Sequence, residues 1–475
     1  MPLALFLTLG QATSVAGIAV DREAGRRTVR VVLAEGRAPE LAGVELPPFW
    51  PAPDLSRDWP GSSGAWHERE VELRSVVRDD GPPAIRTGAW LERGDDALAV
   101  ELVRRGLALA DLVGLPEELA GRLAAAAAEA QRNAAGSWRG RRRAHAARAP
   151  LDSIREPITG VALPLHHIDP FEDYERHLAE IRALGARWVH LLVVASQERV
   201  DSSHVVWHAQ RTPRDERIAA TIRRARAHGL DVLLTPVVLI RAPRPEDWRG
   251  NLRPLVPDAW WLSYTRFLVR MADLASEGGA GALSVGSELA SLEPEPERWR
   301  SVVRAVRARF PGRLTYSANW DHFEAVPFWD VLDFASVSAY FELVSAERPS
   351  VSELELGWRR VLAQVRGLGR TAGLPVVLAE VGIPSLEGAA RTPWDYTLDA
   401  AVDLGAQARA FAAFERVFAP GGRLPSGVQG FFFYDWWGEG GPRSGQYTAR
   451  GKPAQEIWRR TLEALNEGAG PGGAR

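Results

Sequence analysis

The sequence contains no cysteine, and this absence excludes disulfide bridges, thiolate metal ligands and cysteine nucleophiles. Its net charge is only −2 over 475 residues, so the overall charge does not favour nucleic acid or an anionic membrane as a partner. No hydrophobic run is as long as a membrane-spanning helix. Lysine is also scarce: of the 58 basic residues only Lys452 is a lysine, a bias that is typical of a GC-rich genome.

The first residues, 1–9, are apolar but have no lysine or arginine ahead of the hydrophobic run. A secretory signal normally has a positive region there, so a first β-strand explains this segment as well as a signal does. The compartment therefore stays open, with export as the alternative that we favour.

A chain of this length predicts two domains. A break falls near 136–156, where five arginines crowd an alanine-rich, pattern-poor stretch that ends at Pro150 and is typical of a solvated linker. We therefore expect a first domain at 1–140, a linker at 141–154 and a second domain at 155–466. Within the first domain, strand-like segments at 15–20, 28–33 and 71–77 precede helical patterns at 97–106 and 115–135, with a loop insertion at 47–64. This pattern predicts a small α+β or barrel-plus-helix module.

After the linker the chain alternates regularly between strand-like and helical patterns. Apolar runs lie at 158–163, 188–194, 232–238, 282–286, 314–317, 331–338, 376–380 and 428–433. Helical patterns lie at 174–184, 215–228, 261–275, 297–310, 351–368 and 404–418. Eight strands, mostly separated by helices, over roughly 300 residues predict a (β/α)8 TIM barrel. A dinucleotide-binding open sheet would instead have a glycine-rich phosphate loop after its first strand, and residues 163–167 do not form one.

Two glutamates stand at the ends of these apolar runs. Glu288 follows the fourth run and Glu380 ends the seventh. A carboxylate at the carboxyl end of a barrel strand points into the active-site mouth. Glycosidases use two carboxyl groups, about 5 Å apart for retention of configuration and roughly 6.5–9.5 Å apart for inversion. A single glutamate would be explained as surface solvation, but two at barrel strand ends favour catalysis.

Further strand ends carry side chains that suit a sugar. Tyr340 follows the sixth run, where its phenol could hold a nucleophilic carboxylate in its charged form. Asn319 and Trp320 follow the fifth run and offer an amide and an indole face. Trp436 follows the eighth run, where its indole could floor the subsite at the cleaved bond. Each of these aromatic residues could equally belong to the rim or the core.

The histidines do not favour a metal site. His166, His167, Asp169 and His322 match no recognised ligand spacing, and adjacent histidines face different ways. There is also no Gly-x-Ser-x-Gly elbow to support a serine hydrolase. We therefore expect neither a metal nor a cofactor.

Eight short segments have a familiar order and spacing. They are TPRDE at 212–216, AHGLDV at 227–232, DWRG at 247–250, GSEL at 286–289, LTYSANW at 314–320, FWD at 328–330, AEVG at 379–382 and GKPA at 451–454. In this respect residues 155–462 resemble the clan A glycoside hydrolases of family 113, whose characterised members are endo-β-1,4-mannanases. The resemblance implies a retaining mechanism with Glu288 as acid/base and Glu380 as nucleophile. It also places Tyr340 and Trp436 around the nucleophile and the cleaved sugar.

The chain departs from this family at two positions. Residues 235–238 read Thr-Pro-Val-Val where members commonly carry Lys-Pro-His, and Ser287 stands where most of clan A has an asparagine that contacts the sugar 2-hydroxyl. These departures bear on specificity for mannan more than on hydrolysis.

The first domain more faintly resembles a staphylococcal-nuclease-type, OB-type module. Segments at 37–41, 100–108 and 128–138 echo that family, and Glu40 and Arg86 match catalytic positions. Val32 stands where the family has its first catalytic arginine, and Arg37 where it has a calcium-binding aspartate. We therefore expect a degenerate module without nuclease activity, in a structural or binding role.

The sequence thus predicts a retaining glycoside hydrolase acting on a β-linked, manno-configured oligo- or polysaccharide. The alternative is a non-catalytic glycan-binding barrel in which the changes at the third strand and at Ser287 have removed turnover. Ser287, Asn319, Trp320, Tyr340 and Trp436 are the expected substrate-binding residues.

Overall fold

The computed structural model describes residues 6–23, 26–33, 40–46, 70–79, 85–93, 96–112, 115–133, 135–138, 157–165, 174–207 and 212–468. The chain divides into two compact units. The first comprises 1–148, 256–277 and 301–311, and the second, here the barrel unit, comprises 149–255, 278–300 and 312–475. None of the helices within these described ranges is long and apolar enough to cross a membrane.

The N-terminal part of the first unit is built on strands. They are β1 (Phe6–Glu23), β2 (Arg26–Leu33), β3 (Glu40–Leu46), β4 (Glu70–Asp79), β5 (Ile85–Arg93), β6 (Asp96–Ala97) and β7 (Leu109–Ala110). The long β1 pairs with both β2 and β4, while β5 pairs with β4 and, in parallel, with β3. Because β2 also pairs with β3, the pairing closes a ring of five strands, β1, β2, β3, β5 and β4.

Two helices complete this ring, α2 (Leu98–Arg104) and α3 (Glu117–Arg132), followed by a short turn η2 (Gly136–Trp138). Val29, Val31, Trp90, Leu98 and Leu123 belong to one buried cluster. Both helices were expected from the sequence, whereas β3 and β5 were not. The expected loop at 47–64 and linker at 141–154 lie outside the described residues.

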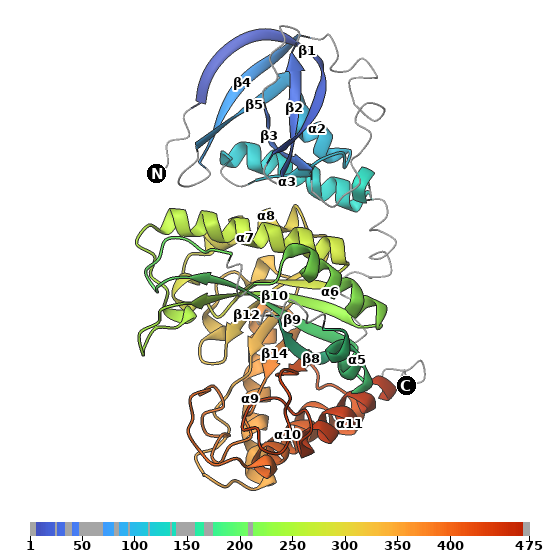
Figure 1. Ribbon diagram of the computed structural model, residues 1–475, viewed down its shortest axis with the longest axis vertical. Coiled ribbons are helices and arrows are strands. Elements are labelled where there is room, and N and C mark those ends of the chain that lie inside the picture. Colours follow the sequence, from blue (N-terminus) through green and yellow to red (C-terminus); the bar gives the residue numbers. More distant parts are fainter. Residues whose placement is uncertain are drawn as a thin grey trace. The chain divides into compact units, whose positions relative to one another are not determined.

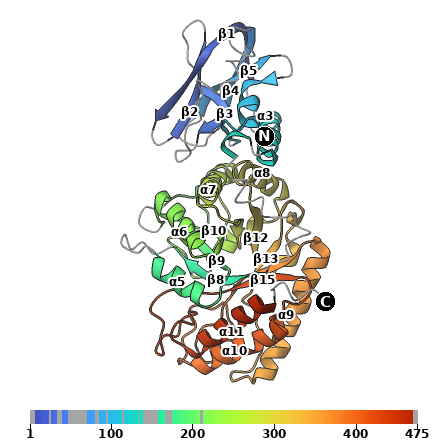
Figure 2. The same cartoon turned by 90° about the vertical axis from the view of Figure 1, so that its right-hand side faces the viewer.

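Eight parallel strands close the barrel in the second unit (Figure 2). They are β8 (Ile158–Pro164), β9 (Trp188–Gln197), β10 (Asp231–Ile240), β11 (Ala282–Ser287), β12 (Arg313–Asn319), β13 (Ala335–Ser338), β14 (Val376–Val381) and β15 (Val428–Phe433). All eight coincide with predicted apolar runs, which confirms the TIM-barrel fold. Strands of a parallel barrel are covered on both faces, and this is why they read as nearly continuous apolar runs.

Side chains rather than solvent fill the barrel interior. One buried cluster consists of Ile158, Trp188, Leu233, Ala282, Phe334, Val377 and Phe432. Glycines allow the strands to approach one another: a Cβ on Gly160 would lie 1.9 Å from the carbonyl oxygen of Trp188, and one on Gly430 would lie 1.8 Å from that of Ile158.

The helices follow the strands in the chain (Figure 1). They are α5 (Glu175–Ala183), α6 (Asp215–Ala227), α7 (Pro257–Gly278), α8 (Pro296–Arg307), α9 (Val351–Ala372), α10 (Leu404–Phe418) and α11 (Pro453–Gly468), with short turns η4 (Arg249–Asn251), η5 (Ala290–Leu292), η6 (Phe323–Ala325), η7 (Trp329–Val331) and η8 (Pro420–Gly422). Aromatic rings join β15 to its helices: Phe433 stacks on Trp458 of α11 at 4.8 Å, and Phe431 meets Phe414 of α10 edge-on at 4.9 Å.

One strand is shorter than its apolar run. The sequence predicts a strand over 331–338, but β13 begins only at Ala335. The turn η7 ends at Val331, and residues 332–334 form a bend. The carboxylate of Asp333 accepts a hydrogen bond from the backbone N–H of Leu314, and Phe328 stacks on Trp299 at 4.8 Å. These side chains hold the preceding segment as a turn. The run is apolar because the turn is buried, not because it is extended.

Candidate active site

Glu288 lies immediately after β11, with a backbone that is unusual for a residue other than glycine. Its φ is +55°, in the left-handed region, and its side chain is buried. Two hydrogen bonds maintain this conformation: Glu288 N–H donates to Ser317 O at 2.8 Å, and Leu289 N–H donates to the Tyr316 hydroxyl at 2.8 Å. Backbone strain of this kind is concentrated at functional sites.

The Glu288 carboxylate is paired with a half-buried arginine. An Nη of Arg249, at the start of η4, lies 2.5 Å from Glu288 Oε2. Burial alone would lower the pKa of the Arg249 guanidinium, but the charges of Glu288 and Glu380 outweigh it and raise this pKa. Arg249 was not among the residues predicted for the site, although its segment DWRG is one of those that carry the family resemblance.

Glu380 lies in β14 and is also buried. Tyr340, just after β13, donates a hydrogen bond from its hydroxyl to Glu380 Oε2 at 2.6 Å. The Tyr340 ring meets Tyr434 and Tyr447 edge-on, with centroids 5.9 Å apart in each case. Gly382 leaves room for these rings, because a Cβ there would lie 2.7 Å from Tyr340. The carboxylate is therefore enclosed by phenol rings and anchored by one of them.

The two carboxylates influence one another electrostatically. Burial, and next the negative charge of Glu288, raise the pKa of Glu380 to about 7, while the Tyr340 hydrogen bond and the charge of Arg249 act in the opposite direction. Burial likewise raises the pKa of Asp435, beyond β15, to about 7, and the charge of Glu380 adds to this effect.

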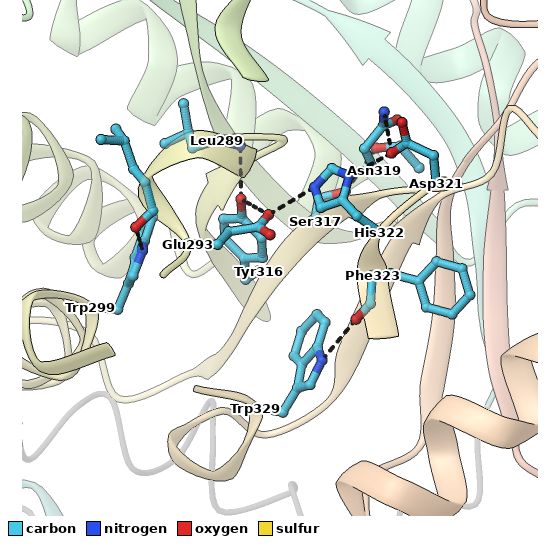
Figure 3. Close-up of polar contacts among 12 residues, drawn as sticks. Leu289, Glu293, Trp299, Tyr316, Ser317, Asn319, Asp321, His322, Phe323 and Trp329 are labelled. Carbon is cyan, nitrogen blue, oxygen red and sulfur yellow. Dashed lines mark hydrogen bonds and ion pairs between the residues drawn. The ribbon is translucent and has the colours of Figure 1, made fainter. Parts of the chain in front are cut away.

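A hydrogen-bonded network supports the segment after Glu288 (Figure 3). The Tyr316 hydroxyl, which accepts from Leu289 N–H, donates to Glu293 Oε1 at 2.6 Å. His322 Nε2 lies 3.2 Å from the same Glu293 oxygen, and His322 Nδ1 lies 2.5 Å from Asp321 Oδ1. Burial alone would lower the pKa of His322, but hydrogen bonds and charges of Glu293 and Asp321 raise it to about 9.

The model of Glycoside Hydrolase Family 113 matches residues 171–449, and this range includes both glutamates, Arg249 and Tyr340. The chain belongs to this family. It is a glycoside hydrolase, as the resemblance implied, and no curated protein matches it.

Solved structures of this family are similar to the chain. The β-mannanase AaManA from Alicyclobacillus acidocaldarius, in complex with ManMIm, is 27% identical with a TM-score of 0.58, over 67% of this chain and all of that one. A second family 113 β-1,4-mannanase is 23% identical with a TM-score of 0.57, over 65% of this chain and 99% of that one. At this level of identity the similarity supports a shared fold and nothing more. These alignments leave about a third of this chain unmatched, and the family model leaves the residues before 171 and after 449 unmatched.

Three of the residues predicted to bind substrate lie at or directly after the ends of β11 and β12. Ser287 directly precedes Glu288, and its hydroxyl is buried without a hydrogen-bond partner among the described residues. Asn319 ends β12, and its amide donates to Asp321 Oδ1 at 3.0 Å. Trp320 follows it and meets Phe341 edge-on at 6.0 Å.

Trp436 takes a different direction. It is buried, its indole N–H donates to Glu180 of α5 at 2.9 Å, and its ring lies 6.3 Å from Trp458 of α11. The structure thus directs this indole to the helices that surround the barrel. Tyr434, two residues earlier, lies beside Tyr340 instead. Burial raises the pKa of the Tyr434 hydroxyl, and the negative charge of Glu380 raises it further.

Sequence reasoning also missed a buried histidine behind the site. His190 Nδ1 lies 3.0 Å from Ala379 O, and Nε2 lies 2.7 Å from the Thr235 hydroxyl. Since a carbonyl oxygen only accepts, Nδ1 carries the proton and Nε2 accepts from Thr235. Burial lowers the pKa of His190 to about 4, so the neutral ring braces the backbone beside Glu380.

The histidines considered for a metal fall into two groups. His166, His167 and Asp169 lie outside the described residues. His322 is paired with Glu293 and Asp321, and within the described ranges no group of three or more such side chains could hold a metal ion.

Proposed function

We propose that this glycoside hydrolase is a retaining enzyme that cleaves a β-linked, manno-configured glycan, with Glu380 as nucleophile and Glu288 as acid/base. The observation that carries the proposal is the pair of buried, electrostatically coupled carboxyl groups at the ends of β11 and β14. The manno-configuration rests on the similarity to the mannanase AaManA, at 27% identity over that whole chain.

The coupling of the two carboxyl groups gives each of them a role. The negative charges of two buried carboxylates oppose one another, which favours a proton on one of them. When Glu288 carries this proton, its negative charge no longer raises the pKa of Glu380, and the Tyr340 hydrogen bond favours the ionised nucleophile. The singly protonated pair is the form that double displacement requires.

The reaction then has two steps. Glu380 attacks the anomeric carbon while Glu288 gives its proton to the leaving glycosidic oxygen, so that a glycosyl ester forms on Glu380 and the aglycone sugar departs. Glu288, now ionised, takes a proton from water, and the resulting hydroxide breaks the ester at the anomeric carbon. The product keeps its configuration, and both carboxyl groups return to their initial states. Ser287, Asn319 and Trp320 are proposed to contact the sugar, whereas Trp436, whose indole is bonded to Glu180 of α5, is not.

The test is sugar release from β-mannan, manno-oligosaccharides, β-glucan and xylan by the wild type and by Glu380→Gln. Glu355→Gln is the matched control, because Glu355 is an ion-paired carboxylate on the surface helix α9. We expect release from mannan by the wild type and the control, and a loss of more than about a thousandfold in Glu380→Gln. Binding of mannan without any release would favour the non-catalytic alternative.

A second measurement assigns the nucleophile. A 2-deoxy-2-fluoromannoside with a good leaving group should inactivate the wild type and add the mass of one fluorosugar to the peptide that contains Glu380. Proton NMR of the first product should show the β-anomer. Initial release of the α-anomer would contradict retention, and a label on another residue would contradict the assignment.

The residues before the barrel are proposed to form a separate module at 1–140, joined by a linker at 141–154 to the barrel at 155–466. The five-stranded ring described above agrees with an OB-type module, and the family model does not reach it. The side chains of Val32, Glu40 and Arg86, and all of residue 37, lie outside the described part of the chain. We expect no cleavage of DNA with calcium present. Cleavage would contradict the degenerate assignment, and salt-dependent binding of DNA would support a binding role.

A further inference from the structure

The turn that presents Arg249 is held by its own contacts. The side chain of Asn251 accepts a hydrogen bond from Trp248 N–H at 3.2 Å and donates one to Glu246 O at 2.8 Å. Gly250 lies against the Trp248 indole, because a Cβ at this glycine would be 2.1 Å from the ring. The guanidinium therefore projects from a turn whose backbone is fixed on both sides.

The guanidinium faces the reacting groups from several strands. Its Nη lies 2.5 Å from Glu288 at the end of β11, and it interacts electrostatically with Glu380 of β14, Tyr340 after β13 and Tyr434 after β15. Its Nε is buried and has no hydrogen-bond partner among the described residues. Arg249 is thus the positive charge placed against two buried carboxyl groups, with one donor unused.

We propose that Arg249 is a positioning residue for hydrolysis, which orients the Glu288 carboxyl group and offsets the negative charge of the two glutamates. The inference rests on the proposed function and adds a third charged group to it. A buried carboxylate that lost its charged partner would be strongly disfavoured. The ion pair with Arg249 therefore also keeps Glu288 from turning away from the cleavage site.

A positive charge beside two carboxyl groups favours their ionised forms. The active enzyme needs one proton on the pair, so the charge of Arg249 determines the pH range in which this form predominates. Removing the charge makes the Glu380 proton harder to lose, so the acidic limb of the activity profile moves to higher pH. For Glu380 this direction is explicit, because Arg249 lowers the pKa of that carboxyl group.

The experiment compares kcat/KM on mannan as a function of pH for the wild type, Arg249→Met and Arg249→Lys. Arg253→Met is the matched control, since the Arg253 guanidinium is mostly exposed and lies 4.0 Å from Asp247 rather than at the carboxyl groups. We expect Arg249→Met to lose at least about tenfold in kcat and to move the acidic limb to higher pH by about one pH unit. Arg249→Lys should restore the acidic limb but not the full kcat, because an ammonium group lacks the planar fork of arginine.

Loss of activity without movement of the acidic limb would overturn the proposal, because a structural role alone would scale the whole profile. A second readout needs no substrate: carbon-13 NMR of carboxyl-labelled glutamate, with the Glu380 signal assigned from Glu380→Gln. Its titration midpoint should rise in Arg249→Met and stay unchanged in Arg253→Met, and an unchanged midpoint in Arg249→Met would again overturn the proposal. If the wild type released no sugar, the proposed function would fail while this titration still decided the role of Arg249.

Discussion

His322 makes the barrel's stability depend on pH in a direction that can be worked out from its contacts. Its ring lies between Glu293 and Asp321, which raise its pKa from 6.5 to about 9 against the effect of burial. The folded protein therefore binds this proton more tightly than the unfolded chain does. The stabilisation is fully present below about pH 6.5, and it is lost as the pH rises through about 9.

The size of the effect follows from the two pKa values. The difference between 6.5 and about 9, at about 1.4 kcal/mol for each pH unit, corresponds to about 3 kcal/mol. This is a large part of the stability of an ordinary domain, so it should be visible in a denaturation curve. The Tyr316 hydroxyl, which shares Glu293 with His322, also holds Leu289 beside Glu288, so the site should loosen as this proton leaves.

The assay is urea unfolding of the wild type and His322→Gln, followed by tryptophan fluorescence at about pH 6 and at about pH 9.5. The glutamine side chain can still form hydrogen bonds but does not titrate. Lys452, whose pKa burial lowers to about 8, titrates in the same range, but it is present in both proteins and cancels in the comparison. The wild type should lose about 3 kcal/mol more than the variant between the two pH values. Equal losses would refute the reasoning.

Two further predictions concern the packing of the barrel and the nucleophile. Gly160→Ala should prevent the barrel from folding, because its Cβ would overlap Trp188 O, whereas Gly367→Ala in α9 meets nothing within 4 Å and should stabilise the protein by about 0.5–1 kcal/mol. Soluble yield and urea unfolding check both, and a well-folded Gly160→Ala would be contrary to the close strand approach. Tyr340→Phe removes the hydrogen bond that lowers the pKa of Glu380. The acidic limb of the kcat/KM profile should therefore move to higher pH by about one pH unit. An unmoved limb would mean that this hydrogen bond does not control the ionisation of Glu380.

The barrel could be predicted from the sequence because its physical cause is local. A strand covered on both faces must be apolar at nearly every position, and the run at 376–380 has this pattern. The failure at 331–338 has the same origin: a buried turn is as apolar as a buried strand, and only the contact of Asp333 with Leu314 distinguishes them. In the first unit β5 was missed because it carries mixed side chains, so its identity depends on the partners β3 and β4.

The candidate site could be predicted where a residue's position follows from a strand end. Glu288 and Glu380 are of this kind, because the barrel brings the ends of β11 and β14 to one face. Arg249 comes from a turn between β10 and α7, and no periodic pattern says where such a turn places its side chains. Trp436 shows the opposite difficulty: its place after β15 was clear, but its direction depends on Glu180, which is 256 residues away in the chain.

The two departures from the family are not equivalent once their surroundings are compared. The Thr235 hydroxyl is committed to His190, whose other nitrogen donates to the backbone next to Glu380, so this change is absorbed by packing inside the barrel. The Ser287 hydroxyl, in contrast, is buried beside Glu288 with no hydrogen-bond partner in the described part of the chain. A buried polar group without a partner is costly, and a sugar hydroxyl could supply the missing partner. Any difference in sugar preference between this chain and its relatives is therefore expected to arise at Ser287 and not at Thr235.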